Sequence, residues 1–319
     1  MTFKVRLLLG AAAPLVFALP AVAQVTISTA TTTPVQTATA SSGAPSDITI
    51  SSPSGTVAPT TTNTTAVTVN SSNDITNNGA ITFNNLNDTV GVRILPGLTG
   101  SYGGSGSISL VEDYTRVDDA SDTDTELDGP LAQGSNRYGI LLEPGGTFTG
   151  DIRIDASNNV TTPVGGSITI EGNNSAGVSL QSNLNGSYVQ NGAVSVTGSN
   201  TIGVDIRGDV SGNVQIGSQA VTTGTAGVVG STVPGTVSAR GDGAVAIRIL
   251  GDVGGEFMID GDVGSTGFAQ GNSSNYKDPD DTSTFTPFAL DADDLFVGGS
   301  AVEIRGDLAR GFLVNGAAI

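Results

Sequence analysis

The stretch NTIGVDIRGDV, residues 200–210, contains the pattern that decides the fold. It opens with Asn200, and three residues later Gly203 provides a position where a neighbouring strand can approach closely. Val204 and Ile206 then flank a polar residue, and alternation with a period of two is typical of a β-strand with one buried face. The dipeptide Gly208-Asp209 that follows is a strong turn signal. The stretch therefore predicts a corner, a short strand and a second corner.

Five other segments align with this stretch without internal gaps. They are DTVGVRILPGL from Asp88, NRYGILLEPGG from Asn136, NSAGVSLQSNL from Asn174, GAVAIRILGDV from Gly243 and GGSAVEIRGDL from Gly298. The first column contains Asp, Asn or Gly, which most readily adopt a left-handed backbone, so it predicts a corner. The column between the two aliphatic positions is polar in five of the six segments, which predicts strands with one buried and one solvent-facing side.

The spacing of the segments indicates the architecture. Successive segments begin 48, 38, 26, 43 and 55 residues apart. The 26-residue interval suits three short strands and three turns, which is one coil of a parallel β-helix. Longer intervals then carry loops inserted at corners, of which 111–135 and 271–294 are acidic. The sequence predicts an all-β solenoid of about eight to ten coils, roughly 40–50 Å long at ~4.8 Å per coil.

The N-terminal segments are expected to differ from the coils. Residues 1–23 have the pattern of a cleaved signal peptide, with Lys4 and Arg6 before an apolar run and small residues at the end. The apolar run is shorter than the roughly 18 residues of a spanning helix, and no later segment could cross a bilayer as a helix. Cleavage would move the formal net charge from -18 to -20. A Thr/Ser/Ala-rich lead, 24–46, is predicted to precede the coils of 47–319.

Composition excludes several function classes. The 319-residue chain has 45 Gly and contains no His, Cys or Trp. Without His or Cys it cannot build a Ser-His-Asp or Cys-His nucleophilic site, nor a zinc site of the usual ligands. Its acidic balance makes nucleic acid an unfavourable partner. Disulfides are not needed where stacked coils bury a continuous core.

Paired carboxylates are the remaining candidates for catalysis, because a glycosidase needs two at a defined spacing. The pairs are Asp118-Asp119, Asp280-Asp281 and Asp293-Asp294. All three lie in the acidic insertions, where solvated charge is the alternative interpretation. Nothing in the sequence defines their geometry, so no catalytic residue is assigned.

A calcium-binding loop is a second candidate, within the insertion 111–135. Asp124, Glu126, Asp128 and Gly129 occupy the first, third, fifth and sixth positions of an EF-hand-like loop. The twelfth position is Ser135, so the bidentate acid is missing, and no flanking helices are expected. The sequence therefore assigns no metal-binding or cofactor-binding residue.

The tripeptide Arg-Gly-Asp, which animal integrins recognise, occurs at 207–209, 240–242 and 305–307. Gly208-Asp209 and Gly306-Asp307 align with turn dipeptides of the other segments, so we interpret them as corners rather than as a ligand. The tripeptide at 240–242 lies at another corner, before Gly243. Asn174 and Asn200 are further expected to form a ladder of amides that hydrogen-bond along the stack.

Several stretches taken together resemble the passenger region of Gram-negative autotransporters. They are the signal sequence, VTISTATTTPVQTATASSGAPSDITI, ITNNGAIT and GVDIRGDVSGNVQIG. The resemblance implies a right-handed parallel β-helix that is secreted via the periplasm to the outer-membrane exterior. It also implies export by a C-terminal β-barrel translocator of the same polypeptide. The chain stops in GFLVNGAAI without such a barrel, so we expect the polypeptide to continue beyond residue 319.

Two functions follow as hypotheses. The first is a cell-surface stalk with a structural or adhesion role, a cell-surface or glycan ligand and no catalytic activity. The alternative is a polysaccharide-active β-helix enzyme, lyase or glycosidase-like. A phage-fibre role is disfavoured by the signal sequence.

Overall fold

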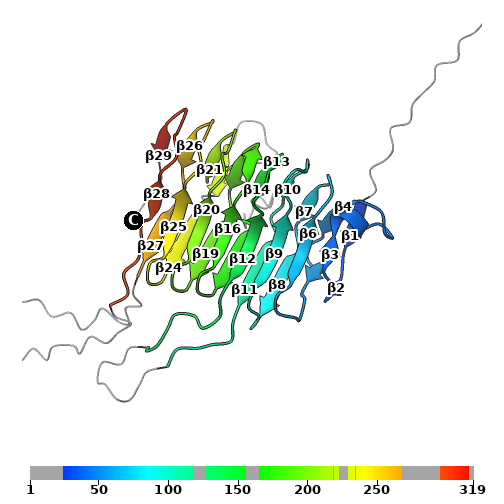
Figure 1. Ribbon diagram of the computed structural model, residues 1–319, viewed down its shortest axis with the longest axis horizontal. Helices are drawn as coiled ribbons and strands as arrows, with labels where there is room; N and C mark the ends of the chain where they lie inside the picture. Colours follow the sequence, from blue (N-terminus) through cyan, green and yellow to red (C-terminus); the bar gives the residue numbers. More distant parts are fainter. Residues whose placement is uncertain are drawn as a thin grey trace, which may run out of the picture.

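The computed structural model describes residues 24–117, 127–155, 165–217, 219–222, 229–233, 235–267 and 295–315. Within these ranges the chain is all-β, apart from one short 3-10 helix, η1 (Thr37–Thr39). Three long parallel sheets run side by side along the molecule (Figure 1). The predicted signal peptide, 1–23, and the acidic insertion 271–294 lie outside the described residues.

Each sheet takes every third strand of the main stack. The nine-stranded first sheet contains β1 (Gln24–Ile27), β4 (Asp47–Ile50), β7 (Ile75–Asn77), β10 (Tyr102–Gly103), β14 (Ile152–Ile154), β18 (Tyr188–Gln190), β21 (Val214–Ile216), β26 (Phe257–Ile259) and β29 (Phe312–Val314). The eight-stranded second sheet contains β2 (Ala30–Thr31), β5 (Thr56–Val57), β8 (Ala80–Asn84), β11 (Ser107–Val111), β15 (Ser167–Glu171), β19 (Ala193–Thr197), β24 (Thr236–Arg240) and β27 (Val263–Thr266). The eight-stranded third sheet contains β3 (Val35–Gln36), β6 (Thr65–Val69), β9 (Thr89–Ile94), β12 (Arg137–Leu142), β16 (Ala176–Leu180), β20 (Ile202–Ile206), β25 (Val245–Ile249) and β28 (Val302–Ile304).

The chain visits the first, second and third sheets in turn, and we call one such passage a coil. Two minor sheets interrupt this order: β13 (Thr147–Thr149) pairs parallel with β17 (Asn183–Asn185), and β22 (Gln219–Thr222) pairs antiparallel with β23 (Val229–Val233). The nine strands of the first sheet agree with the expected eight to ten coils. The arrangement is consistent with a parallel β-helix or another solenoid.

The strand register of the third sheet confirms the alignment of the six segments. The inward column runs Val92, Ile140, Val178, Val204, Ile247 and Val302, each paired with the next. Every predicted interval, from 26 to 55 residues, therefore matches a parallel pairing. The register is well specified because a slip by one residue would exchange the buried and exposed faces.

The left-handed corner is confirmed at five of its six predicted positions. Asp88, Asn136, Asn174, Asn200 and Gly243 have φ between 51° and 66°. Gly298 does not adopt a positive φ, so that corner is built differently. Asn63, with φ 54°, occupies the equivalent place one coil before Asp88. The alignment missed it because its Thr-rich strand, with Ala66 at the glycine position, lacks the Gly of the other early segments.

The small-residue column allows close approach between coils, as predicted. A Cβ on Gly139 would lie 2.5 Å from the carbonyl oxygen of Gly177, and one on Gly177 would lie 2.6 Å from that of Gly203. Both distances are shorter than the closest non-bonded approach of a carbon and an oxygen atom. Glycine here lets the coils stack at strand spacing.

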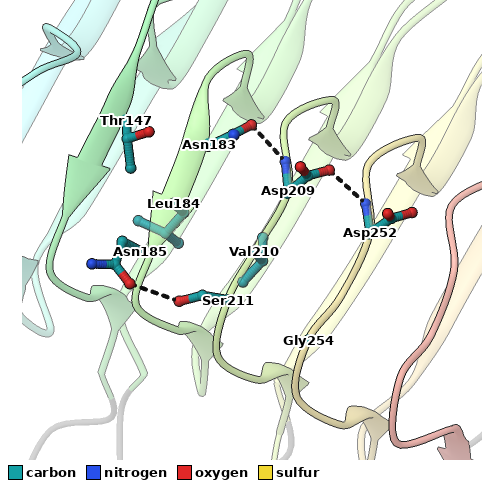
Figure 2. A pocket seen from close by; sticks show the side chains of 9 residues that line it. All are labelled: Thr147, Asn183, Leu184, Asn185, Asp209, Val210, Ser211, Asp252 and Gly254. Atoms are coloured by element: carbon teal, nitrogen blue, oxygen red, sulfur yellow. Dashed lines mark hydrogen bonds between the residues drawn. The ribbon is translucent and has the colours of Figure 1, made fainter.

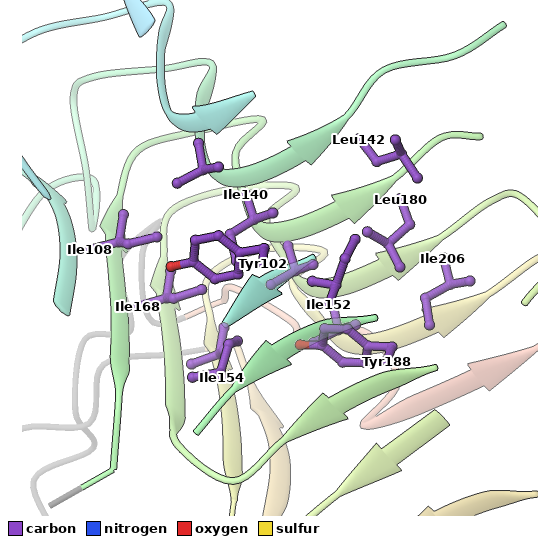
Figure 3. Close-up of a cluster of buried hydrophobic side chains, with 14 of the residues drawn as sticks. Tyr102, Ile108, Ile140, Leu142, Ile152, Ile154, Ile168, Leu180, Tyr188 and Ile206 are labelled. Atoms are coloured by element: carbon purple, nitrogen blue, oxygen red, sulfur yellow. The ribbon is translucent and has the colours of Figure 1, made fainter. Parts of the chain in front are cut away.

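Inward-facing aliphatic side chains from all three sheets form one continuous core (Figure 3). Ile140, Leu142, Leu180 and Ile206 of the third sheet face Ile108 and Ile168 of the second sheet and Tyr102, Ile152, Ile154 and Tyr188 of the first. Each buried aliphatic side chain contributes on the order of 1.5–3 kcal/mol, so the narrow core gains stability from its length.

The column expected to face solvent is not uniformly exposed, which corrects the prediction for the outer side of the third sheet. Ser179 and Asp205 are each only 1% exposed, and Leu141 is 8% exposed. For Asp205 the reason is local, because Arg207 and Arg248 both pair with its carboxylate and so cover it. Strand alternation predicts which face of the sheet a side chain lies on, but it does not predict whether a long neighbouring side chain covers it.

The predicted lead segment forms a coil of its own. Within 24–46, strands β1, β2 and β3 pair with β4, β5 and β6 in the three sheets. The described part of the stack therefore already includes Gln24 and does not begin at Asp47. No helix within the described ranges is long and apolar enough to cross a membrane.

Candidate functional site

Two of the three Arg-Gly-Asp tripeptides lie at the corner that follows the third sheet, where their glycines are required by the preceding coil. A Cβ on Gly208 would lie 2.2 Å from the carbonyl oxygen of Ser182. One on Gly251 would lie 2.2 Å from the Gly208 oxygen, and one on Gly306 would lie 1.9 Å from the Gly251 oxygen. In these three coils no larger residue fits at the glycine position without moving the backbone.

Asn183, Asp209 and Asp252 at this corner bind the following coil. Asn183 Oδ1 accepts the backbone N–H of Asp209 at 3.0 Å, and Asp209 Oδ1 accepts that of Asp252 at 3.0 Å (Figure 2). Asp252 Oδ1 in turn accepts the N–H of Asp307 at 2.8 Å. We call this row, Asn183, Asp209, Asp252 and Asp307, the aspartate ladder. Each acceptor stabilises the turn of the next coil, as a side-chain cap does at a helix start.

The third tripeptide is structural in the same way. Gly241 has φ 144°, and a Cβ there would lie 2.1 Å from the Gly198 carbonyl oxygen. Asp242 Oδ1 accepts the backbone N–H of Val297 at 3.2 Å. The corner interpretation of the three tripeptides is thus supported by contacts that use their Gly and Asp residues.

A second row of side chains joins the coils at the start of the first sheet. The acceptors Asp47, Asp74, Asp151, Ser187 and Asn213 each take a backbone N–H from the next coil, over 2.7–3.1 Å. The amide ladder predicted for Asn174 and Asn200 is different: no hydrogen bond joins these two described side chains, and in their column Asn136 Nδ2 donates to Asp88 Oδ1 at 2.9 Å. The 26-residue spacing of Asn183 and Asp209 is the signal that could have located a true ladder.

A groove lies beside the aspartate ladder. Its volume is about 310 Å³, and it is lined by Thr147, Asn183, Leu184, Asn185, Asp209, Val210, Ser211, Asp252 and Gly254 (Figure 2). Leu184 and Val210 lie between the aspartate ladder and the polar pair Asn185–Ser211, in which Ser211 Oγ donates to Asn185 Oδ1 at 3.0 Å. Since Asp209 and Asp252 each commit one carboxylate oxygen to the stack, the groove offers hydrogen-bond acceptors rather than a free acid–base pair.

A second depression, of about 290 Å³, lies on the outer side of the third sheet. We call it the arginine pocket, and it is lined by Asn136, Tyr138, Asn174, Ser175, Ala176, Asn200, Ile202, Asp205, Arg207 and Arg248. Sequence reasoning did not find it. Arg207 and Arg248 are 41 residues apart in sequence, and only the coil pairing of β20 with β25 brings them to one carboxylate.

The base of the first acidic insertion is closed by a buried ion pair. Arg137 is 1% exposed, and its Nη1 lies 3.3 Å from Glu112 Oε2. The Glu112 carboxylate also accepts the backbone N–H groups of Gln133 and Gly134, each at 2.7 Å. Burial lowers the pKa of Arg137, and the Glu112 carboxylate opposes that shift. The pair ties the ends of 111–135 to the stack, which is a structural role.

Two buried tyrosines also have shifted pKa values. Burial raises the pKa of Tyr102 to about 12, opposed by a hydrogen bond with Asn77. Burial likewise raises the pKa of Tyr188, whose hydroxyl donates to Gln190 Oε1 at 2.7 Å. Both rings face the core, so neither group is placed for acid–base chemistry on a ligand.

The carboxylate pairs Asp118-Asp119, Asp280-Asp281 and Asp293-Asp294 lie outside the described residues, as do Asp124 and Glu126 of the calcium loop. Of that loop, Asp128 donates its backbone N–H to Val117 at 3.0 Å, and Ser135 donates its own to Asn87 Oδ1 at 3.0 Å. In the part of the chain that the structure describes, no three Asp or Glu side chains gather in a geometry that could hold a metal ion.

Among the depressions of the described surface, the groove and the arginine pocket both include polar side chains, and the corner side chains of the stack are engaged between coils. The groove presents acceptors, and the arginine pocket presents donors. No model of a known protein family matches the chain, and no curated protein and no solved structure matches it.

Proposed function

We propose that this chain is a right-handed parallel β-helix of the autotransporter passenger type. In this proposal it acts outside the cell as a stalk with a structural or adhesive role and without catalytic activity. The observation that carries the proposal is the use of corner side chains along the stack: Asp, Asn and Ser oxygens accept backbone N–H groups of the next coil. Residues employed in this way build length and rigidity.

The shape and the charge support the same role. The three sheets extend along the long axis of the molecule, so most coils contact only their neighbours (Figure 1). A formal net charge of -18 favours solubility and opposes unspecific association of such rods. The signal sequence expected from residues 1–23 supplies the export that an extracellular role requires.

The enzymatic alternative has less support. A lyase or glycosidase needs carboxylates free to exchange protons or to attack a sugar. In the described groove, Asp209 and Asp252 each hold a backbone N–H of the following coil. These hydrogen bonds hold the two carboxylates against the next coil, and they do not orient them as a catalytic pair toward a substrate.

Surface display tests the proposal. The chain with its signal sequence is placed before an autotransporter β-barrel in a Gram-negative host, and intact cells are treated with an external protease and an antibody. We expect antibody labelling, cleavage from outside, and an N-terminus at Gln24 in the released protein. Retention of the whole chain inside the cell would refute the extracellular role.

Adhesion is tested with the same cells. Displaying cells should bind immobilised glycans, matrix proteins or each other above cells that display the barrel alone. Equal binding by both would leave a purely structural stalk. Release of unsaturated or reducing sugars from a polysaccharide panel by the purified chain would instead favour the enzyme.

A further inference from the structure

We propose that the arginine pocket binds the anionic group of a saccharide, a carboxylate or a sulfate carried on a sugar ring. The choice of a saccharide rests on the adhesive role proposed above. The pocket itself is defined by the residues of three successive coils, from β12 to β20, together with Arg248 of the next.

The two arginines are held in place by a single carboxylate. The Asp205 side chain is 2% exposed; its Oδ2 lies 2.7 Å from Arg207 Nε and its Oδ1 lies 2.9 Å from Arg248 Nε. Both pairs use Nε. The terminal nitrogens of the two guanidinium groups make no hydrogen bond to any of the described residues. They remain free to donate to a ligand, and a guanidinium fork matches a carboxylate or sulfate well.

The local charge is positive although the chain is acidic. Two guanidinium groups share one carboxylate, which leaves one net positive charge at the pocket. The next acid along the column after Asp205 is Glu303, which is engaged by Arg305 with 2.5 Å between Oε1 and Nη2. Arg207 is 49% exposed and Arg248 is 23% exposed in their side chains, so both can be reached from solvent.

The rest of the lining suits a sugar. Tyr138 supplies an aromatic ring, and Asn136, Asn174 and Asn200 supply amides that can both donate to and accept from hydroxyl groups. Ala176 is small and leaves the space between these walls open. A volume of about 290 Å³ suits one or two sugar rings, at the lower end of the usual range for ligand pockets.

The charge of the whole chain narrows the ligand further. With a formal net charge of -18, the surface around the pocket repels a long polyanion. A saccharide with a single anionic group keeps the attraction to the two arginines without that repulsion. Nucleic acids and densely sulfated chains are therefore expected to bind poorly.

Calorimetry on the purified chain tests the inference with three trisaccharide probes. One ends in glucuronate, one is its uncharged methyl ester, and one carries a single sulfate instead. Arg207→Gln and Arg248→Gln are compared with Arg153→Gln, because Arg153 also pairs through Nε with an aspartate, Asp155 at 3.2 Å, but lies on the first sheet. The single variants keep Asp205 paired with the remaining arginine, and their melting temperatures are checked.

We expect at least one charged probe to bind and the methyl ester to bind about tenfold or more weakly. Each pocket variant should lose about tenfold in affinity, as expected for one charge-assisted hydrogen bond, while Arg153→Gln binds as the parent does. The sulfate and glucuronate probes show which anion is preferred. Failure of all charged probes, or binding that both pocket variants retain while folded, would overturn the inference.

The outcome is separable from that of the proposed function. If cells that display Arg207→Gln or Arg248→Gln adhere as well as cells that display the parent chain, the result contradicts ligand binding at the arginine pocket and preserves the adhesive role. Purified chain that binds a charged probe, when displaying cells adhere to nothing, would preserve the pocket and contradict the adhesive role.

Discussion

The tripeptides at 207–209 and 305–307 have the same three residues and lie at the same corner, yet their surroundings differ. Gly208 and Gly306 are both too close to the preceding coil to carry a side chain. Asp209 accepts a backbone N–H from the following coil, whereas the side chain of Asp307, exposed at the end of the described stack, accepts none among the described residues. The glycine allows close contact with the preceding coil, and the aspartate can accept an N–H group only from a following coil. The position in the stack therefore decides the role of the aspartate.

The hydrophobic columns show the same contrast. Phe257 of β26 is fully buried, while its register partner Phe312 of β29 is 43% exposed. The two rings stack with centroids 4.7 Å apart. Leu313 and Val314 are also about two-fifths exposed, because within the described residues the last coil has a neighbour on one side only. An interior residue is therefore expected to contribute more than its partner at the end.

The largest expected effect separates these two phenylalanines. Phe257→Ala should lower the free energy of unfolding by about 3–5 kcal/mol, because it leaves a cavity inside the stack. Phe312→Ala should cost about 1 kcal/mol, since its ring is only partly enclosed. Urea unfolding of both variants measures the difference. Equal losses would mean that the last coil is as well covered as the interior.

The next effect concerns the glycine that both tripeptides share. Gly208→Ala should cost about 1–3 kcal/mol or more, because its Cβ would meet the Ser182 backbone and one coil must shift. Gly103→Ala is the matched control, since its nearest contact would be an ordinary 3.5 Å to the Asp155 carboxylate. Thermal and urea unfolding should show a large loss for the first variant alone. A mild Gly208→Ala variant would show that coils move apart easily.

The aspartates distinguish the two tripeptides directly. Asp209→Ala should cost about 1–2 kcal/mol, because the N–H of Asp252 loses its acceptor. Asp307→Ala should stay within about 0.5 kcal/mol, as a surface substitution does. Asp209→Asn keeps an acceptor oxygen and should recover most of the loss. Equal behaviour of Asp209→Ala and Asp307→Ala in urea unfolding would remove the distinction between interior and end.

The smallest expected effect is on cell binding. Asp209→Glu and Asp307→Glu should leave adhesion of displaying cells to animal cells unchanged, because we interpret both tripeptides as corners. A selective loss with Asp307→Glu would show that a receptor recognises the exposed tripeptide at 305–307. A loss with Asp209→Glu in a variant that keeps its unfolding midpoint would favour recognition of the tripeptide at 207–209 as a ligand.

Local pattern was sufficient to predict much of the fold. The alternation of Val204 and Ile206, repeated in five other segments, predicted the register of the third sheet across insertions of unequal length. The left-handed Asn and Asp corners followed from residue type. The lead segment was harder to interpret, because β2 and β3 are two-residue strands and show no periodicity. Their place in the sheets depends on pairing with β5 and β6.

The sequence by itself determined the repeat, the strands and the corners, because each depends on residues close together in the chain. Only the tertiary structure decided which polar groups meet. Asp209 reaches the N–H of Asp252 across an insertion, and Asp205 is covered by Arg248 of the next coil. Such contacts depend on stacking, which places residues 26–55 positions apart at strand spacing. The same stacking turns three Arg-Gly-Asp tripeptides into corners and assembles an arginine pocket with no sequence motif of its own.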